Sequence, residues 1–196
     1  MFRYCAILFF SITIVVLLAH FLTFGLRKIR RPGLFSPIAM FKRYLGFYKD
    51  LAVFKELVLL GGAVFFVLLF VTGFFMPLVM GEKTQGYLLM GHLIVAPVFI
   101  ILIVVSVFLF ANAHLPEQKG QEWGFAKGLS KLLFWVLFVL AMPLFISILL
   151  SMLKLFGSEG QEFLLGVHRY CAIFFTVVFV SLMYVSLFPY FSKSRS

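Results

Sequence analysis

The sequence predicts an all-α integral membrane protein with five transmembrane helices. Of its 196 residues, 63% are hydrophobic and only 12% are charged, whereas average soluble domains carry roughly 25% charged residues. The mean hydropathy is +1.12. Five apolar stretches each reach the length of about 20 residues that a helix needs to cross a bilayer. Little of the chain remains outside the bilayer, so its chemistry must lie within the helices, at their ends or on a partner.

The five predicted helices run approximately over 4–26, 51–80, 87–114, 131–156 and 163–190. The second, third and fifth are long enough to tilt or to protrude from the bilayer. The first could be mistaken for a signal peptide, but it is too long, shows no obvious cleavage site and is followed at once by the basic run RKIRR. We therefore expect residues 1–26 to form an uncleaved N-terminal transmembrane helix.

Lysine and arginine predict the orientation. Twelve of them lie in the segments 27–50 and 115–131 and in the tail 191–196, whereas four lie near the opposite helix ends, namely Arg3, Lys83, Lys154 and Arg169. Basic loops stay in the cytoplasm. We therefore expect a multi-pass protein of the inner (plasma) membrane, with the N-terminus and the loops near 81–86 and 157–162 outside, and the C-terminus in the cytoplasm. The net charge of +10 then reflects topology and contact with anionic lipid, and no nucleic-acid partner is expected.

The segment 27–50 follows the first helix and interleaves aromatic with basic residues, as in GLFSPIAMFKRYLGFYKD. This pattern is typical of an interfacial segment on the inner leaflet; the alternative is a plain basic linker. The two cysteines, Cys5 and Cys171, form no CxxC or CxxCH motif. This excludes a covalent c-type haem and an iron–sulfur cluster held by this chain alone, while a disulfide between the two thiols is an alternative.

His92 and His168 lie about one turn inside the third and fifth helices, which enter the membrane from the same side. Their depths should therefore match, near the outer face. Ionisable residues inside a membrane are costly and usually functional. Two imidazoles on facing helices can ligate one haem iron from both sides. We predict that His92 and His168 are the metal ligands of one bis-histidine haem b.

The residues around this pair fit a flat ring. Gly91 flanks His92, Ala96 and Ala172 lie one turn beyond the two histidines, and Gly61, Gly62 and Gly73 open the second helix; small residues allow close approach. Arg169 could bind a haem propionate through its guanidinium. The alternatives are that His92 and His168 are interfacial residues bound to headgroups or carbonyls, and that Arg169 snorkels to the membrane surface.

Other polar residues are secondary candidates. His20 and His114 lie at the inner ends of the first and third helices and could hold a second haem, although an interfacial role is the alternative. Lys55 and Glu56, at the inner start of the second helix, could serve a quinone site; the alternative is an ion pair without a redox role.

Four segments carry a resemblance to a known family. They are FVLLFVTGFFM, GYLLMGHLIVAPVF, FANAHLPEQKG and FLLGVHRYCAIFF. In order, spacing and topology they resemble the cytochrome b subunits of formate dehydrogenases and membrane-bound nickel–iron hydrogenases, which are cytochrome b561-like bundles. The resemblance implies that residues 51–190 form a four-helix bundle with His92 and His168 as ligands of an outer haem. It also implies electron transfer between an outward-side iron–sulfur or cytochrome c subunit and quinone.

The chain departs from that family at two points. The ligands of the family's inner haem correspond to positions near Leu59 and near Leu182, so we expect the inner haem to be absent. The extra N-terminal helix is also unlike the simplest members. It would either cover the side of the bundle or supply a substitute ligand through His20.

The function expected from these observations is that of a membrane-embedded b-type haem electron-transfer subunit. It would belong to a hetero-oligomeric respiratory oxidoreductase complex rather than act as a stand-alone enzyme. The alternative is a cofactor-free membrane anchor or assembly subunit. A small transporter is disfavoured, because transporters place polar groups at the midplane and this midplane is apolar apart from Thr72, Ser106 and Ser147.

Overall fold

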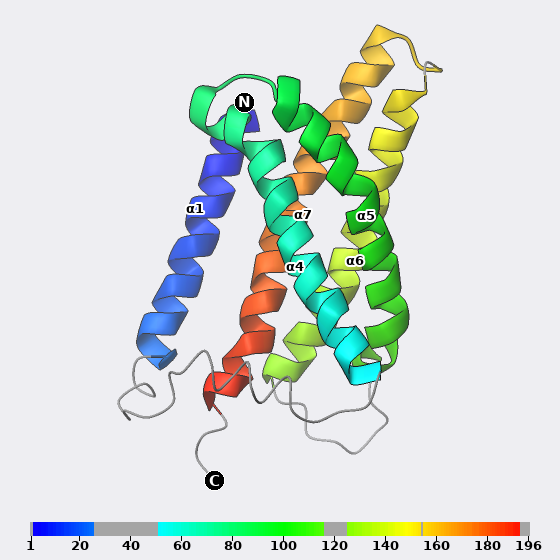
Figure 1. The fold of residues 1–196 in the computed structure, drawn as a ribbon. Coiled ribbons are helices and arrows are strands. Elements are labelled where there is room, and N and C mark those ends of the chain that lie inside the picture. Colours follow the sequence, from blue (N-terminus) through cyan, green and yellow to red (C-terminus); the bar gives the residue numbers. More distant parts are fainter. Residues whose placement is uncertain (1, 26–50, 116–124, 154, 193–196) are drawn as a thin grey trace.

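The computed structural model describes residues 2–25, 51–115, 125–153 and 155–192. Over these ranges the chain is all-helical, with a first helix and two helical hairpins (Figure 1). The long helices are α1 (Phe2–His20), α4 (Leu51–Phe75), α5 (Gly86–Phe110), α6 (Phe125–Met152) and α7 (Ser158–Ser192). Helices α1 and α4 continue into short π-helical segments, η1 (Phe21–Gly25) and η2 (Met76–Met80), and α5 continues into a short 3-10 helix, η3 (Ala111–His114).

Within the described ranges, five helices are long and apolar enough to cross a membrane, which confirms that part of the prediction which concerns an all-α chain with five such helices. Their apolar spans are Phe2–Thr23, Phe54–Met80, Gly86–His114, Gly128–Met152 and Ser158–Ser186. The first three agree closely with the predicted stretches.

The predicted outer loop at 157–162 was wrong. Helix α6 ends at Met152, and α7 already begins at Ser158, so the polar residues 158–162 are helical. Gly157 makes the turn with φ +21°, and its carbonyl accepts a hydrogen bond from the Gln161 N–H at 3.1 Å. Glu159 in the first turn favours a helix N-terminus. The predicted start of this helix depended on hydropathy, which shows only where the apolar residues begin. Helix α7 starts earlier and includes the polar residues 158–162.

Several sequence predictions fall outside the described residues. These are the interfacial segment 27–50, the loop 116–124, Lys154 and residues 193–196 of the cytoplasmic tail. They stay predictions.

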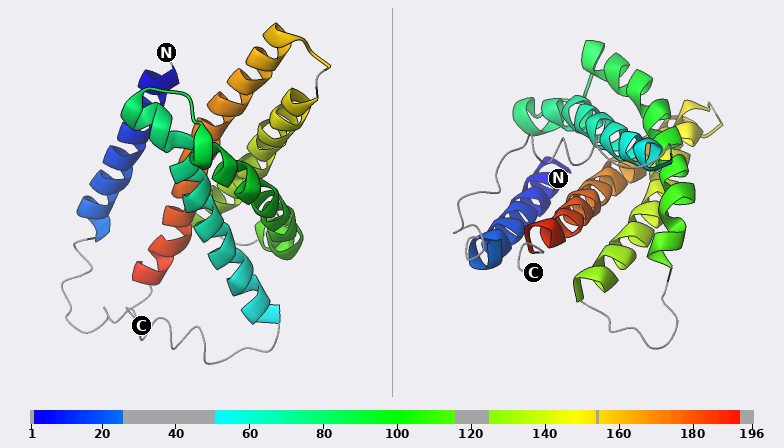
Figure 2. Two further views of the ribbon diagram at one scale, coloured as in Figure 1. Left: turned by 45° about the horizontal axis from the view of Figure 1, so that its top comes forward. Right: turned by 60° about the horizontal axis from the view of Figure 1, so that its bottom comes forward.

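The two hairpins, α4–α5 and α6–α7, cross one another (Figure 2, left). Helix α4 packs mainly on α5, and α6 packs mainly on α7. The hydrophobic core forms where the hairpins meet; its buried residues are Phe99, Ile103, Phe134, Leu137, Ala141, Leu144, Phe175, Phe179 and Leu182. Phe66 of α4 joins it by stacking on Phe179, with ring centres 4.0 Å apart. This core fixes the position of α5 relative to α7, on which the candidate site depends.

Helix α1 lies along α7 (Figure 1) and covers the side of the bundle, one of the two arrangements expected for it. A second buried cluster holds it there, in which Ala6 packs with Phe74 of α4 and Ile173 of α7. The Phe10 ring also meets Phe74 edge-on, with ring centres 5.2 Å apart. Cys5 on α1 and Cys171 on α7 are both free thiols.

Candidate functional site: a two-histidine cavity

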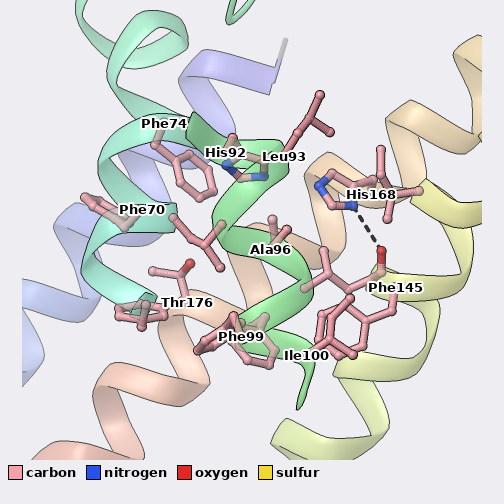
Figure 3. Close-up of a pocket in the computed structure, with 16 residues that line it drawn as sticks. Phe70, Phe74, His92, Leu93, Ala96, Phe99, Ile100, Phe145, His168 and Thr176 are labelled. Atoms are coloured by element: carbon pink, nitrogen blue, oxygen red, sulfur yellow. Dashed lines mark hydrogen bonds between the residues drawn. The ribbon is translucent and has the colours of Figure 1, made fainter. Parts of the chain in front are cut away.

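His92 of α5 and His168 of α7 lie beside each other (Figure 3), His92 between one and two turns after the start of α5 and His168 almost three turns after the start of α7. Their ring centres are 6.4 Å apart, and the ring planes are nearly perpendicular at 87°. In the described part of the chain no hydrogen bond joins the two rings. The fold therefore brings together the two residues that the sequence singled out, with space between them.

The His168 ring is oriented by a backbone carbonyl. Its Nδ1 lies 3.0 Å from the Leu144 carbonyl oxygen of α6. Since a carbonyl can only accept, Nδ1 must carry the proton and Nε2 keeps its lone pair. In Figure 3 the other ring nitrogen of His168 lies on the side towards His92.

The His92 ring is oriented by a hydroxyl. Its Nδ1 lies 3.2 Å from Thr72 Oγ1 on α4. The Thr72 hydroxyl donates its own proton to the Leu68 carbonyl at 2.7 Å, so towards His92 it acts as an acceptor. This assigns the proton of His92 to Nδ1 and leaves Nε2 free. Metal-bound histidines have this arrangement, in which the second nitrogen donates to a neighbouring oxygen.

Gly73 allows the His92 ring to lie against α4. A Cβ at this position would come within 3.0 Å of His92 Cε1 and 3.2 Å of Nδ1. Among the small residues named in the sequence analysis, Gly73 is therefore the one whose missing side chain makes room for the His92 ring. Gly91, which was expected to border the cofactor, faces Thr72 Cγ2 at an ordinary 3.6 Å for a Cβ. It lies at the contact of α4 with α5, outside the residues that line the cavities.

Two adjoining cavities meet at the histidines, with volumes of about 90 Å³ and about 370 Å³. The larger lies in the range of small-molecule and cofactor sites, about 300–1,000 Å³. Apart from the histidines, the smaller is lined mainly by apolar side chains of all four bundle helices, including Phe70, Ala96, Phe99 and Phe145, with the buried hydroxyl of Thr176 beside them (Figure 3). Six residues border both cavities, namely Phe74, His92, Leu93, Ile148, His168 and Ala172.

The larger cavity has a basic rim. Arg169, the predicted propionate partner, lines it together with Arg3 of α1 and Lys83 of the α4–α5 connection. Sequence reasoning used Arg3 and Lys83 only for topology. One signal could have identified them, because basic residues on the outer side are unusual under the positive-inside rule.

The structure gives His20 and His114 separate surroundings. His20 Nδ1 lies 2.6 Å from Tyr184 Oη of α7. The His114 ring stacks on Phe134 with centres 4.2 Å apart, and its carbonyl accepts a hydrogen bond from Trp135. Since α1 and α5 lie on opposite sides of α7 and α4 (Figures 1 and 2), the two histidines do not face each other.

Lys55 and Glu56, the remaining candidates, lie near the start of α4, at the end of the bundle opposite to the two histidines. The Lys55 ammonium lies 5.9 Å from the centre of the Phe110 ring, and its neighbour Glu56 is half-buried. Leu182 is only 6% exposed within the packed core, whereas Leu59 is 45% exposed on α4. Neither of these positions, which correspond to the inner haem ligands of the family that the sequence resembles, lines either of the two cavities at the histidines.

The spacing of the two imidazoles suits one shared metal atom. Metal–imidazole bonds are about 2 Å long and a ring centre lies about 1 Å beyond its nitrogen, so two opposed ligands have centres about 6 Å apart. Over the described ranges no group of three or more His, Cys, Asp or Glu side chains could hold an ion. The pair therefore suits a metal that brings its other ligands with it, as the iron of a haem does.

The fold and the site thus define a helical, membrane-type bundle with a two-histidine cavity. No protein-family model, no curated protein and no solved structure matches this chain.

Proposed function

We propose that this chain is a membrane-embedded b-type haem electron-transfer subunit of a respiratory oxidoreductase complex. One observation carries the proposal. His92 and His168, on different helices, have ring centres 6.4 Å apart, and each uses Nδ1 for an oxygen partner, which leaves both Nε2 atoms free.

A bound haem would supply one-electron chemistry at its iron. His92 and His168 would hold the iron through their Nε2 atoms. The Thr72 hydroxyl and the Leu144 carbonyl hold the two rings in orientation and raise their basicity as ligands. These two hydrogen-bond partners of the histidines come from α4 and α6.

The lining of the site would keep water from the ring. Phe99 and Phe175 are 2% and 3% exposed and meet edge-on with centres 6.0 Å apart, at the inner floor of the smaller cavity. An apolar, dry surrounding tunes the reduction potential of a haem. The floor also separates the site from the inner half of the bundle.

The electron partners are part of the same proposal. The connection between α4 and α5 spans only residues 81–85, too few to bind a soluble substrate. We propose an outward-side iron–sulfur or cytochrome c subunit as donor, in a hetero-oligomeric complex of the inner membrane. Quinone is the proposed acceptor. It would react near the outer site, because the packed core around Leu182 leaves no matching inner site.

The test is a dithionite-reduced minus oxidised optical spectrum of the purified chain, with a pyridine haemochrome count. The proposal predicts about one b haem per chain. Two would require a further site, which the arrangement of His20 and His114 in this structure does not provide. None, after expression with ample haem, would contradict the proposal and favour a cofactor-free anchor or assembly subunit.

A further inference from the structure

We propose that helix α1 is part of the cofactor site, because its Arg3, together with Lys83 and Arg169, binds the two carboxylates at the outer edge of the haem. This inference rests on the proposed function and deepens it. The resemblance places the site in the four-helix bundle alone; here the additional helix supplies one of its polar contacts.

The charge at the rim of the larger cavity favours an anionic ligand. Three cations from three elements line the same cavity as the two histidines. Across residues 2–25, 51–115, 125–153 and 155–192, none of the three forms an ion pair with an acidic side chain. Glu82 is the acidic residue that also lines this cavity. Two haem carboxylates together with Glu82 would balance the three positive charges.

Arg3 is held in place by the packing of its neighbours in α1. Phe2, the residue before it, stacks on Phe74 with ring centres 6.2 Å apart and meets Tyr170 edge-on at 5.9 Å. Ala6, one turn further on, is fully buried. The start of α1 is therefore packed against both α4 and α7, and the Arg3 side chain leaves from a fixed point.

The turn at Gly81 accommodates the Arg3 guanidinium. A Cβ at Gly81 would lie 2.9 Å from Arg3 Nη1, and Gly81 has φ +75°, a region that disfavours side chains. Glycine thus serves both the turn and the close approach of Arg3.

The connection between α4 and α5 is also held in place by a hydrogen bond beside His92. Pro77 has no N–H, so the Gly73 carbonyl lacks its usual helical donor. The Thr84 hydroxyl takes that place, donating to the Gly73 carbonyl at 3.2 Å. This contact anchors residues 81–85 next to the glycine on which His92 lies, and it keeps Lys83 on the rim.

The chemistry favours carboxylates as the bound group. A guanidinium binds a carboxylate through two parallel hydrogen bonds, stronger than those between neutral groups. A lipid phosphate shares the negative charge and the oxygen acceptors, so the experiment must separate the two sources.

The experiment compares the wild-type chain with Arg3→Gln, loaded with haem, by haem transfer to a haem-free globin and by the midpoint potential. Losing a charge-assisted hydrogen bond should make haem transfer about tenfold faster. The midpoint potential should fall, because removing a positive charge favours the ferric state. The low-spin spectrum should not change, since both ligands remain.

Two further variants complete the design. Lys83→Gln, in the exposed connection, should change both readouts in the same direction even if Arg3→Gln folds poorly, and Arg3→Lys should restore part of the effect. The matched control is Lys131→Gln, since the Lys131 ammonium contacts the Leu115 carbonyl at the opposite end of the bundle.

The outcomes are distinguishable. If the wild type binds haem but Arg3→Gln and Lys83→Gln change neither haem transfer nor potential, the inference is wrong and the proposed function stands. If these variants lose co-purified phospholipid phosphate without any effect on the haem, the rim binds lipid and the inference is again wrong. If the wild type binds no haem, the proposed function itself fails.

Discussion

The Leu144 carbonyl of α6 and the Nδ1 atom of His168 on α7 are 3.0 Å apart, and this single contact determines which nitrogen of His168 faces the cavity. A ring held through Nδ1 presents Nε2 to the space between the hairpins. The Thr72 hydroxyl does the same for His92 from the other hairpin. Each histidine ring is thus oriented by the partner helix within its own hairpin.

Removing either histidine should abolish haem retention. In His92→Leu and His168→Leu, one of the two proposed ligands is lost, and over the described residues no group of three or more His, Cys, Asp or Glu side chains could hold the metal instead. The measurement is the haemochrome count per purified chain. His114→Leu is the control, because His114 stacks on Phe134 away from the cavity. A full low-spin haem signal in either ligand variant would refute the assignment.

Thr72→Val should weaken haem binding while the ligands stay in place. The valine keeps the shape but cannot accept the Nδ1 proton of His92, and loss of such an outer partner typically costs about 10–100-fold in metal affinity. Haem titration of the apoprotein measures this. Thr13→Val is the matched control, since the Thr13 hydroxyl also donates to the carbonyl four residues back, but on α1. Equal affinities for both variants would contradict the role of Thr72.

Gly73→Ala should displace His92. The new methyl group would come within 3.0 Å of Cε1, so either the ring or α4 must move. We expect a loss of haem or a changed low-spin spectrum. Gly62→Ala on the same helix is the control, because nothing lies within 4 Å of its added Cβ and both variants gain the same helix propensity, about 1 kcal/mol. Identical spectra of the two variants would show that Gly73 does not support the ring.

Ala172→Phe should block the cofactor without touching a ligand. Ala172 lines both cavities next to His168, and a phenyl ring would occupy the space that a flat cofactor needs. The haem content should fall strongly, while circular dichroism reports an unchanged helical fold. Val104→Phe, on the exposed face of α5, should keep its haem. A normal haem count in Ala172→Phe would mean that the cofactor lies elsewhere.

The sequence predicts the framework of this site well. Hydropathy locates the five helices, and chain direction then places His92 and His168 at one end at similar depth. What it cannot predict is the packing between helices. The contact of His168 with Leu144 and that of His92 with Gly73 depend on side-chain directions set by the crossing of the hairpins, and a carbonyl partner leaves no sign in the sequence.

The basic residues show the same limit of prediction from sequence. Arg3 and Lys83 are counted in the prediction of the membrane orientation, yet nothing in their local sequence links them to a cavity. Their convergence with Arg169 depends on α1 packing against α4 and α7, through Phe2 and Ala6. Gly91 is the converse case. Its place beside His92 in the chain suggested a cofactor contact, but its missing side chain faces the neighbouring helix.

The most direct test of the central claim is near-infrared magnetic circular dichroism of the oxidised, purified chain, which reports the axial ligands of a ferric haem. The account predicts the low-spin signature of two imidazole ligands, lost in both His92→Leu and His168→Leu. A high-spin signal, or a low-spin signature of any other ligand pair, would contradict ligation by these two histidines.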